Sequence, residues 1–231
     1  MSPKILLFGA GGALGAAIAN HLLREGCTLF TAGTTRCSGA LDHLQLAYDD
    51  PCSASTFSSL PGLDAVVWAQ GLNCSDTVES FESADLHRLL QGNVVFIASS
   101  LQALLIAGKL EAGSRLAVVS SIWQLESRPG KFSYTLSKAA LQGLVKSCAL
   151  DLGRRGILIN AVLPGVVDTP MTRTHLSPEQ ITAITSQSAL GRLPEPADIA
   201  SAVAFLVAPA NRAITGQFLT VDAGFVGLKH A

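Results

Sequence analysis

Lys4 to Gly26 reads KILLFGAGGALGAAIANHLLREG, and this stretch decides the fold. A short apolar run comes first, then a glycine-rich turn, then apolar residues at helical spacing up to Gly26, which can cap a helix. This order is typical of a dinucleotide-binding unit, because the glycines let the backbone approach a pyrophosphate at the helix N-terminus. We expect a cofactor against this turn, at Gly9, Gly11, Gly12, Leu14 and Gly15.

Strands and helices alternate along the rest of the chain. Apolar runs predict strands at residues 28–32, 44–48, 63–69, 115–120, 156–163 and 217–221. Helical periodicity predicts helices at residues 81–109, 132–152 and 196–207. We predict a single α/β domain over residues 1–231: a Rossmann-type doubly wound sheet, mostly or wholly parallel, of about seven strands with helices on both faces. The more polar residues at about 170–193 would form a substrate lid beside the cofactor cleft.

The composition narrows the class of protein. Hydrophobic residues make up 48% of the 231 residues and charged residues 14%, so the chain can bury a substantial core. The net charge of -1 gives no electrostatic case for nucleic acid or an anionic membrane. The five histidines show no metal-ligand spacing, so we expect no metal.

The cysteines and the N-terminus bear on localisation. Five scattered cysteines without a C-x-x-C fit free thiols in a reducing compartment better than a disulfide framework. No apolar run approaches the ~20 residues that span a bilayer, so we expect no membrane partner. Residues 4–19 imitate a signal peptide, but its removal would delete the first strand. We therefore expect a cytoplasmic protein.

A second informative stretch, Ser121 to Lys138, reads SIWQLESRPGKFSYTLSK. Tyr134 and Lys138 are four apart, so a helix places both side chains on one face. An ammonium beside a phenol favours the phenolate and lowers the tyrosine pKa from its ordinary value near ~10. Such a tyrosine can exchange a proton with an alcohol or carbonyl oxygen, which Ser121 could also hydrogen-bond. Tyr-x-x-x-Lys alone is common by chance, and an exposed helix with an ordinary Tyr and Lys is the alternative.

Three further polar residues have both a functional and a structural interpretation. No acidic residue follows the second strand, and Arg36 with Thr34 could bind a ribose 2′-phosphate, which favours NADP over NAD; the alternative is a plain polar loop. Asp49 could face the adenine or cap a helix. Asn93 lies inside a predicted helix, where it either makes contacts near the site or lies on a polar face, and spacing alone favours the polar face.

Taken together, these motifs resemble the short-chain dehydrogenases/reductases over nearly the whole chain. The family's serine, thirteen positions before its tyrosine, matches Ser121, and its helix asparagine matches Asn93. Its N-A-x-x-P-G segment and following threonine match residues 160–165 and Thr169, and its late acidic signature matches residues 215–222.

The chain departs from the family pattern on the cofactor side. Phe8 replaces a threonine, Ala13 replaces the middle glycine, and Asn-Asn-Ala-Gly becomes Trp68-Ala69-Gln70-Gly71. Phe8 and Trp68 could substitute packing for hydrogen bonding. These departures motivate a rival interpretation, a catalytically weak or inactive dinucleotide-binding regulatory or scaffold protein.

The resemblance implies hydride transfer between NADP(H), or NAD(H), and a small-molecule carbonyl or secondary alcohol. Tyr134 would be the general acid/base, Lys138 would lower its pKa and bind the nicotinamide ribose, Ser121 would orient the substrate, and Asn93 would hold a water in the proton path. A tyrosine–lysine interval of four disfavours the enoyl-reductase branch. A homodimer or homotetramer is also implied. Further cofactor contacts are expected at Ala69, Gly71, Pro164, Val167 and Thr169.

Overall fold

The computed structural model describes residues 2–50 and 52–227, apart from the His175 side chain. These residues form a seven-stranded sheet in the order β3-β2-β1-β4-β5-β6-β7, and every neighbouring pair is parallel. The strands are β1 (Lys4–Phe8), β2 (Thr28–Gly33), β3 (Asp42–Gln45), β4 (Leu63–Trp68), β5 (Leu110–Val119), β6 (Leu158–Pro164) and β7 (Phe218–Val221). The predicted doubly wound parallel fold is confirmed.

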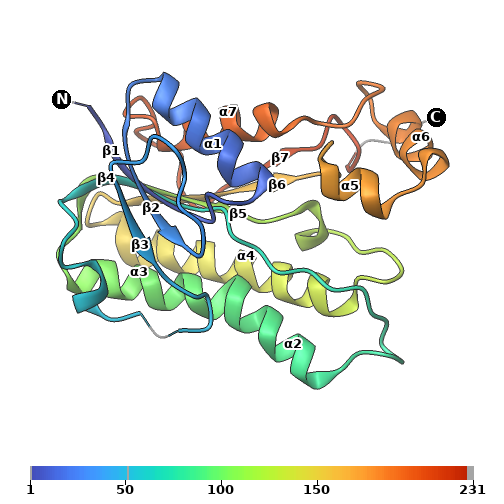
Figure 1. The fold of residues 1–231 in the computed structure, drawn as a ribbon, viewed down its shortest axis with the longest axis horizontal. Coiled ribbons are helices and arrows are strands. Elements are labelled where there is room, and N and C mark those ends of the chain that lie inside the picture. Colours follow the sequence, from blue (N-terminus) through green and yellow to red (C-terminus); the bar gives the residue numbers. More distant parts are fainter. Residues whose placement is uncertain (1, 51, 228–231) are drawn as a thin grey trace.

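Helices cover both faces of the sheet, with α1 and α7 on one side and α2, α3 and α4 on the other (Figure 1). The helices are α1 (Ala13–Arg24), α2 (Ser83–Leu90), α3 (Phe96–Ile106), α4 (Phe132–Gly153), α5 (Pro170–His175), α6 (Pro178–Gln187) and α7 (Pro196–Val207). Three short segments, η1 (Ala54–Phe57), η2 (Gln91–Val95) and η3 (Ile122–Gln124), complete the elements.

Side chains of β1 alternate between two cores, because successive residues of a strand point to opposite faces. Leu6 and Phe8 pack in the core shared with α3 and α4. Ile5 and Leu7 pack in the core shared with α1 and α7. Burial on both faces explains why the strands read as continuous apolar runs rather than as alternating patterns.

An aromatic cluster fills the core beneath the carboxyl ends of β1 and β4. Phe8 and Trp68 are register partners, and their rings stack 5.8 Å apart at an interplanar angle of 4°. Phe57 and Phe96 each present an edge to Phe8. The Trp68 Nε1–H donates to Ser100 Oγ at 2.9 Å. Packing together with one hydrogen bond therefore holds this part of the sheet, as the two substitutions led us to expect.

Three predicted boundaries are wrong, each for a local reason. β3 covers residues 42–45 rather than 44–48, and Tyr48 turns inward to contact Phe96. β5 begins at Leu110 rather than residue 115, because a register shift between Leu63 and Ala65 accommodates an irregular start of the strand. The helix predicted at residues 81–109 is interrupted by the π-helical turn η2.

One helical segment bears on membrane association. Ser83–Ile106 is 24 residues long, its most apolar stretch has a mean hydropathy of 1.7, and it is the single segment among the described residues that could cross a bilayer by length and composition alone. Half of its most apolar stretch is buried inside the fold. Its apolar side chains, among them Phe96, Ile97 and Leu101, pack in the core against the sheet, as expected of a core helix.

Candidate active site

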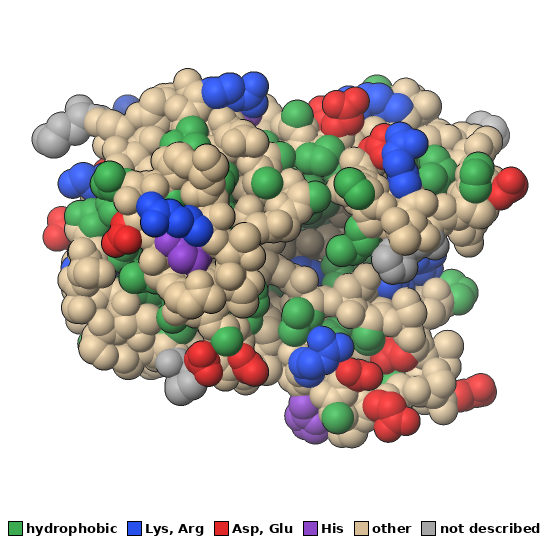
Figure 2. Space-filling model, viewed as in Figure 1, with side chains coloured by type: hydrophobic (Ala, Val, Ile, Leu, Met, Phe, Trp, Pro, Cys, Tyr) green, Lys and Arg blue, Asp and Glu red, His purple; other side chains and the backbone are tan. Residues whose placement is uncertain are grey.

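The carboxyl ends of β1, β4, β5 and β6 meet at one edge of the sheet, where the chain switches direction between β1 and β4. In open α/β sheets this edge is where ligands bind. The same view in space-filling form shows the surface hollowed there, with the region of α5 and α6 on one flank (Figure 2). The candidate residues follow directly on these strand ends.

The turn between β1 and α1 is built so that backbone lies against backbone. Gly9 has a φ of 80°, and a Cβ there would lie 2.4 Å from Gln70 N. A Cβ on Gly15 would lie 2.0 Å from Gly9 O, so only glycine allows α1 to approach β1 this closely. Gly12 caps α1 without a side-chain hydrogen bond, and the first turn holds no acidic residue. The N-terminus of α1, including Leu14, therefore fits a dinucleotide pyrophosphate.

The loop after β2 lies against this turn. A Cβ on Gly11 would be 2.7 Å from Thr35 Cβ, so the two segments touch. Thr34 and Arg36 are exposed, and Arg36 Nη2 donates to Ala40 O at 3.3 Å. This is the one hydrogen bond of the guanidinium within residues 2–50 and 52–227, and no carboxylate stands at residues 34–36.

The predicted adenine contact, Asp49, is exposed in a turn beyond β3. The side chain of its neighbour Tyr48 makes closer contacts with the rest of the fold. Burial raises the pKa of Tyr48, and the nearby Gly9 backbone acts in the opposite direction without reversing the shift. Sequence reasoning missed Tyr48, because nothing in the polar segment signalled that its side chain folds back onto the glycine turn.

Ser121, Tyr134 and Lys138 come together as the sequence predicted. Ser121 caps η3, where its Oγ accepts from Trp123 N at 3.3 Å, and its side chain acts on the Tyr134 hydroxyl to lower the tyrosine pKa. Tyr134 lies in the first turn of α4, with the Lys138 Nζ 5.7 Å from its ring centroid. Lys138 is buried and donates to Val119 O at 3.3 Å.

The predicted lowering of the tyrosine pKa is wrong for the protein without cofactor. Burial raises the pKa of Tyr134 to about 12, although the bond from Ser121 acts to lower it. Burial also lowers the pKa of Lys138 to about 8. The Lys138 ammonium lies over the ring, and the loss of water around the phenolate outweighs the attraction.

Asn93 is buried in η2, so the polar-face alternative is wrong. Its Oδ1 accepts from Leu72 N at 2.7 Å. Its Nδ2 donates to Leu72 O and to Ser137 Oγ, each at 3.0 Å. These contacts join the chain after β4 to α4. Gly71 lies within this group, because a Cβ there would be 3.5 Å from Lys138 Nζ and 3.9 Å from Asn93 Oδ1.

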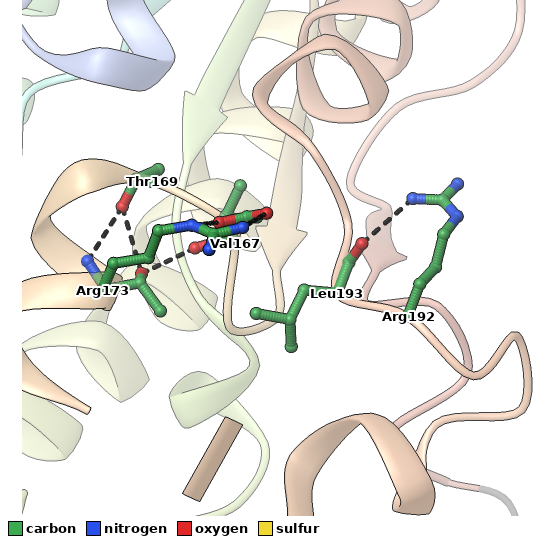
Figure 3. A network of polar contacts seen from close by, with 7 residues as sticks. Val167, Thr169, Arg173, Arg192 and Leu193 are labelled. Carbon is green, nitrogen blue, oxygen red and sulfur yellow. Dashed lines mark hydrogen bonds and ion pairs between the residues drawn. The ribbon is translucent and has the colours of Figure 1, made fainter. Parts of the chain in front are cut away.

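The chain after β6 turns into α5 through a compact polar network (Figure 3). Thr169 caps α5 by accepting from Thr172 N at 3.2 Å, and the Thr172 hydroxyl donates to Val167 O at 2.6 Å. Arg173 forms a double hydrogen bond with Asp168, at 2.7 and 2.6 Å. Pro164 ends β6 and is buried. Val167 and Thr169 thus lie on the segment that leads from β6 to α5, at the same edge of the sheet as the candidate catalytic residues.

Ala69 and Gly71 follow β4 as predicted. The burial of Gln70, which lies between them, was not predicted. Gln70 is buried, and both of its side-chain polar atoms are without a hydrogen-bond partner among the described residues. No group of three or more His, Cys, Asp or Glu side chains that could hold a metal is present in residues 2–50 and 52–227.

Known proteins resemble the chain in sequence and in fold. A family model described as enoyl-(acyl carrier protein) reductase matches residues 50–226. The 3-oxoacyl-[acyl-carrier-protein] reductase FabG of Vibrio cholerae serotype O1 is 30% identical over 234 residues, which cover 95% of each protein.

Two solved structures share the fold at similar length. A short-chain dehydrogenase/reductase of Serratia marcescens BCRC 10948 superposes with a TM-score of 0.83 at 28% identity, over 96% of this chain and 97% of that one. The structure of BdcA in complex with NADPH gives a TM-score of 0.83 at 26% identity, over 99% and 96%. The chain belongs to the short-chain dehydrogenase/reductase family of NAD(P)-dependent oxidoreductases.

Proposed function

We propose that this protein transfers a hydride between NADP(H) and a small carbonyl or secondary alcohol, with Tyr134 as the general acid/base. The observation that carries the proposal is the convergence of three side chains: Ser121 acts on the Tyr134 hydroxyl to lower its pKa, and the buried Lys138 Nζ lies 5.7 Å from the centroid of the same ring. Two donors thereby meet at one point, where a substrate oxygen can be held and protonated.

Each residue of this group has a distinct task. The bound cofactor supplies or accepts the hydride. Ser121 orients and polarises the substrate oxygen, while Tyr134 gives it a proton in reduction and takes one in oxidation. Lys138 holds the nicotinamide ribose and favours the phenolate. Its pKa of about 8 lets it exchange a proton with solvent near neutral pH.

Asn93 belongs to the same proton path in this proposal. Its amide is fully used by Leu72 and Ser137, so a water leading to Lys138 would rest on the main chain of η2. A single π-turn interrupts the regular hydrogen-bond ladder of a helix and is frequent at functional sites. The position of Gly71, beside both Asn93 and Lys138, is consistent with this arrangement.

The preference for NADP rests on the loop after β2. Arg36 stands there with Thr34, and no acidic residue repels a 2′-phosphate. A relative of the same fold, BdcA, is solved with NADPH. Val167 and Thr169 would hold the nicotinamide carboxamide, and Asp49 would lie toward the adenine.

We favour carbonyl over enoyl reduction. The matched family model bears the enoyl name, whereas the FabG relative is named for a 3-oxoacyl substrate. In carbonyl reduction the proton goes to the oxygen of the carbon that receives the hydride. Ser121 and Tyr134, whose side chains interact, suit one such oxygen.

The arrangement around the site completes the proposal. The chain would act as one domain, with residues at about 170–193 as a lid over the substrate. Homodimers or homotetramers are expected of the family. Free thiols at all five cysteines, each in the described ranges, agree with a cytoplasmic location.

The rival function is dinucleotide binding without turnover, and the departures from the family pattern at Phe8, Ala13 and Trp68-Ala69-Gln70 are the observation that favours it. The test is a fluorescence titration with NADPH and NADH, followed by a panel of ketones, aldehydes and α,β-unsaturated carbonyls. We expect tighter NADPH binding and consumption of NADPH with a carbonyl. Failure to bind either nucleotide at millimolar concentration would contradict the proposal, and binding without turnover would favour the rival.

A further inference from the structure

A second lysine stands beside the candidate catalytic tyrosine. Lys131 immediately precedes α4, and its side chain is almost inaccessible, with the residue 6% exposed. Its Nζ lies 5.4 Å from the Tyr134 ring centroid, as close as the 5.7 Å of Lys138. Two ammonium groups therefore contact one phenol.

Lys131 also holds the segment that follows β4. Its Nζ donates to Asn73 Oδ1 at 2.8 Å and to Cys74 O at 3.1 Å. Asp76 then accepts from Ser133 N through its Oδ1 at 3.0 Å. The segment from Leu72 to Asp76 is thereby attached to the start of α4, and its beginning is the part that Asn93 holds.

We propose that Lys131 is a positioning residue for proton transfer, which fixes the 72–76 segment against α4 and stabilises the phenolate of Tyr134 together with Lys138. This inference rests on the proposed function. Its physical basis is that a positive charge near a phenol favours ionisation, and that the attraction is strong where water is excluded.

Several charged and titratable groups share this environment. Burial lowers the pKa of Lys131, Arg128 lowers it further, and Cys74 and Asp76 act in the opposite direction. Burial acts to raise the pKa of Asp76, but hydrogen bonds from Ser133 and Cys74, with the charge of Lys131, lower it overall. Asp76 therefore offsets part of the lysine's charge. Ser121 and Lys138 complete the surroundings of the Tyr134 ring.

The direction of the effect follows from these charges. Alcohol oxidation requires the basic form of Tyr134, so kcat/KM for oxidation rises with pH through the tyrosine pKa. Removal of Lys131 disfavours the phenolate and shifts this rise to higher pH, by roughly one unit. Removal of the Asp76 charge shifts it to lower pH.

The test compares pH profiles of alcohol oxidation for Lys131→Met, Lys131→Arg and Asp76→Asn. Lys146→Met is the matched control, since Lys146 is an exposed lysine of the same helix. We expect the Lys131→Met profile to move to higher pH, Lys131→Arg to restore it at least in part, Asp76→Asn to move it to lower pH, and the control to stay in place. A Lys131→Met enzyme with reduced kcat and an unmoved profile would overturn the inference, because that result indicates structural support alone.

A direct titration separates this inference from the proposed function. The chain has two tyrosines, so ¹³Cζ-tyrosine labelling gives two NMR signals that can be followed from pH 8 to 12, up to the Tyr134 pKa of about 12, with and without NADP⁺. In Lys131→Met the Tyr134 signal should begin to titrate at higher pH, while the Tyr48 signal is unchanged. An unchanged Tyr134 signal would overturn the inference. An absence of turnover in every variant would instead overturn the proposed function and leave this readout intact.

Discussion

The indole of Trp68 lies parallel to the ring of Phe8, with 5.8 Å between the ring centroids, and its N–H donates to Ser100 in α3. Both rings are fully buried directly before the glycine turn and Gly71. The stack packs β1 against β4, whose carboxyl ends lead into the candidate cofactor site, and the Trp68–Ser100 hydrogen bond joins β4 to α3.

Ser100→Ala tests that contact. The variant leaves the buried Trp68 N–H without an acceptor, which should lower the free energy of unfolding by roughly 1–3 kcal/mol. Urea unfolding measures the change. Ser99→Ala is the control, because the partly buried Ser99 hydroxyl bonds only to Phe96 O within its own helix. A Ser100→Ala protein as stable as wild type would show that the Trp68 N–H contact contributes little.

Arg36→Leu tests the cofactor preference. Hydrogen bonds to charged groups contribute about 1.5–3 kcal/mol, so the Kd for NADPH should rise by roughly 10- to 100-fold while the Kd for NADH changes little. Arg24→Leu on the last turn of α1 is the control. Equal weakening of both nucleotides would mean that Arg36 supports the loop, through its bond to Ala40 O, rather than a 2′-phosphate.

Lys138→Met tests the cost of burying an ammonium. The pKa of Lys138 is lowered from 10.5 to about 8, so the unfolded chain binds more protons between these values, and the stability from this group rises as pH increases through that window. Below pH 8 the full cost is present. The variant should therefore be more stable than wild type at pH 7, by on the order of 3 kcal/mol, while it loses activity. Calorimetry at pH 7, 8.5 and 10 should show the gap narrowing, and a gap independent of pH would contradict the account.

Arg173→Ala tests the link between the candidate lid and the chain after β6. The Arg173 side chain is 68% exposed, so loss of its solvent-screened pair with Asp168 should leave the free energy of unfolding almost unchanged. If α5 moves as part of the lid, KM for the carbonyl should rise severalfold with kcat largely retained. Arg88→Ala, which breaks another exposed pair, serves as the control. An unchanged KM would remove the Asp168–Arg173 pair from the proposed lid.

The alternation of apolar runs with segments of helical periodicity was sufficient to predict the parallel sheet. Both patterns arise because the residues of a segment are buried together against the same core. The one-residue insertion of η2 was not predictable, since a π-turn hardly disturbs a 3.6-residue period over a long helix. The predicted end of β3 was wrong because Tyr48 lies outside the strand. Its side chain instead reaches Gly9, which is distant in sequence.

The candidate site was predictable where spacing carried the chemistry, as for Tyr134 and Lys138 on adjacent turns of α4. The sign of the tyrosine pKa shift was not, because it depends on how much water the fold excludes. No sequence pattern indicated a role for Lys131 either, since its hydrogen-bond partner Asn73 lies 58 residues away.

The central claim is that Tyr134 transfers the proton, and Tyr134→Phe tests it most directly. The change removes one hydroxyl and keeps the ring that both lysines contact. The measurement is kcat for carbonyl reduction alongside the Kd for NADPH. We predict that kcat falls at least about 100-fold while the Kd stays within about twofold of wild type. A variant that binds NADPH normally and retains its turnover would contradict the account.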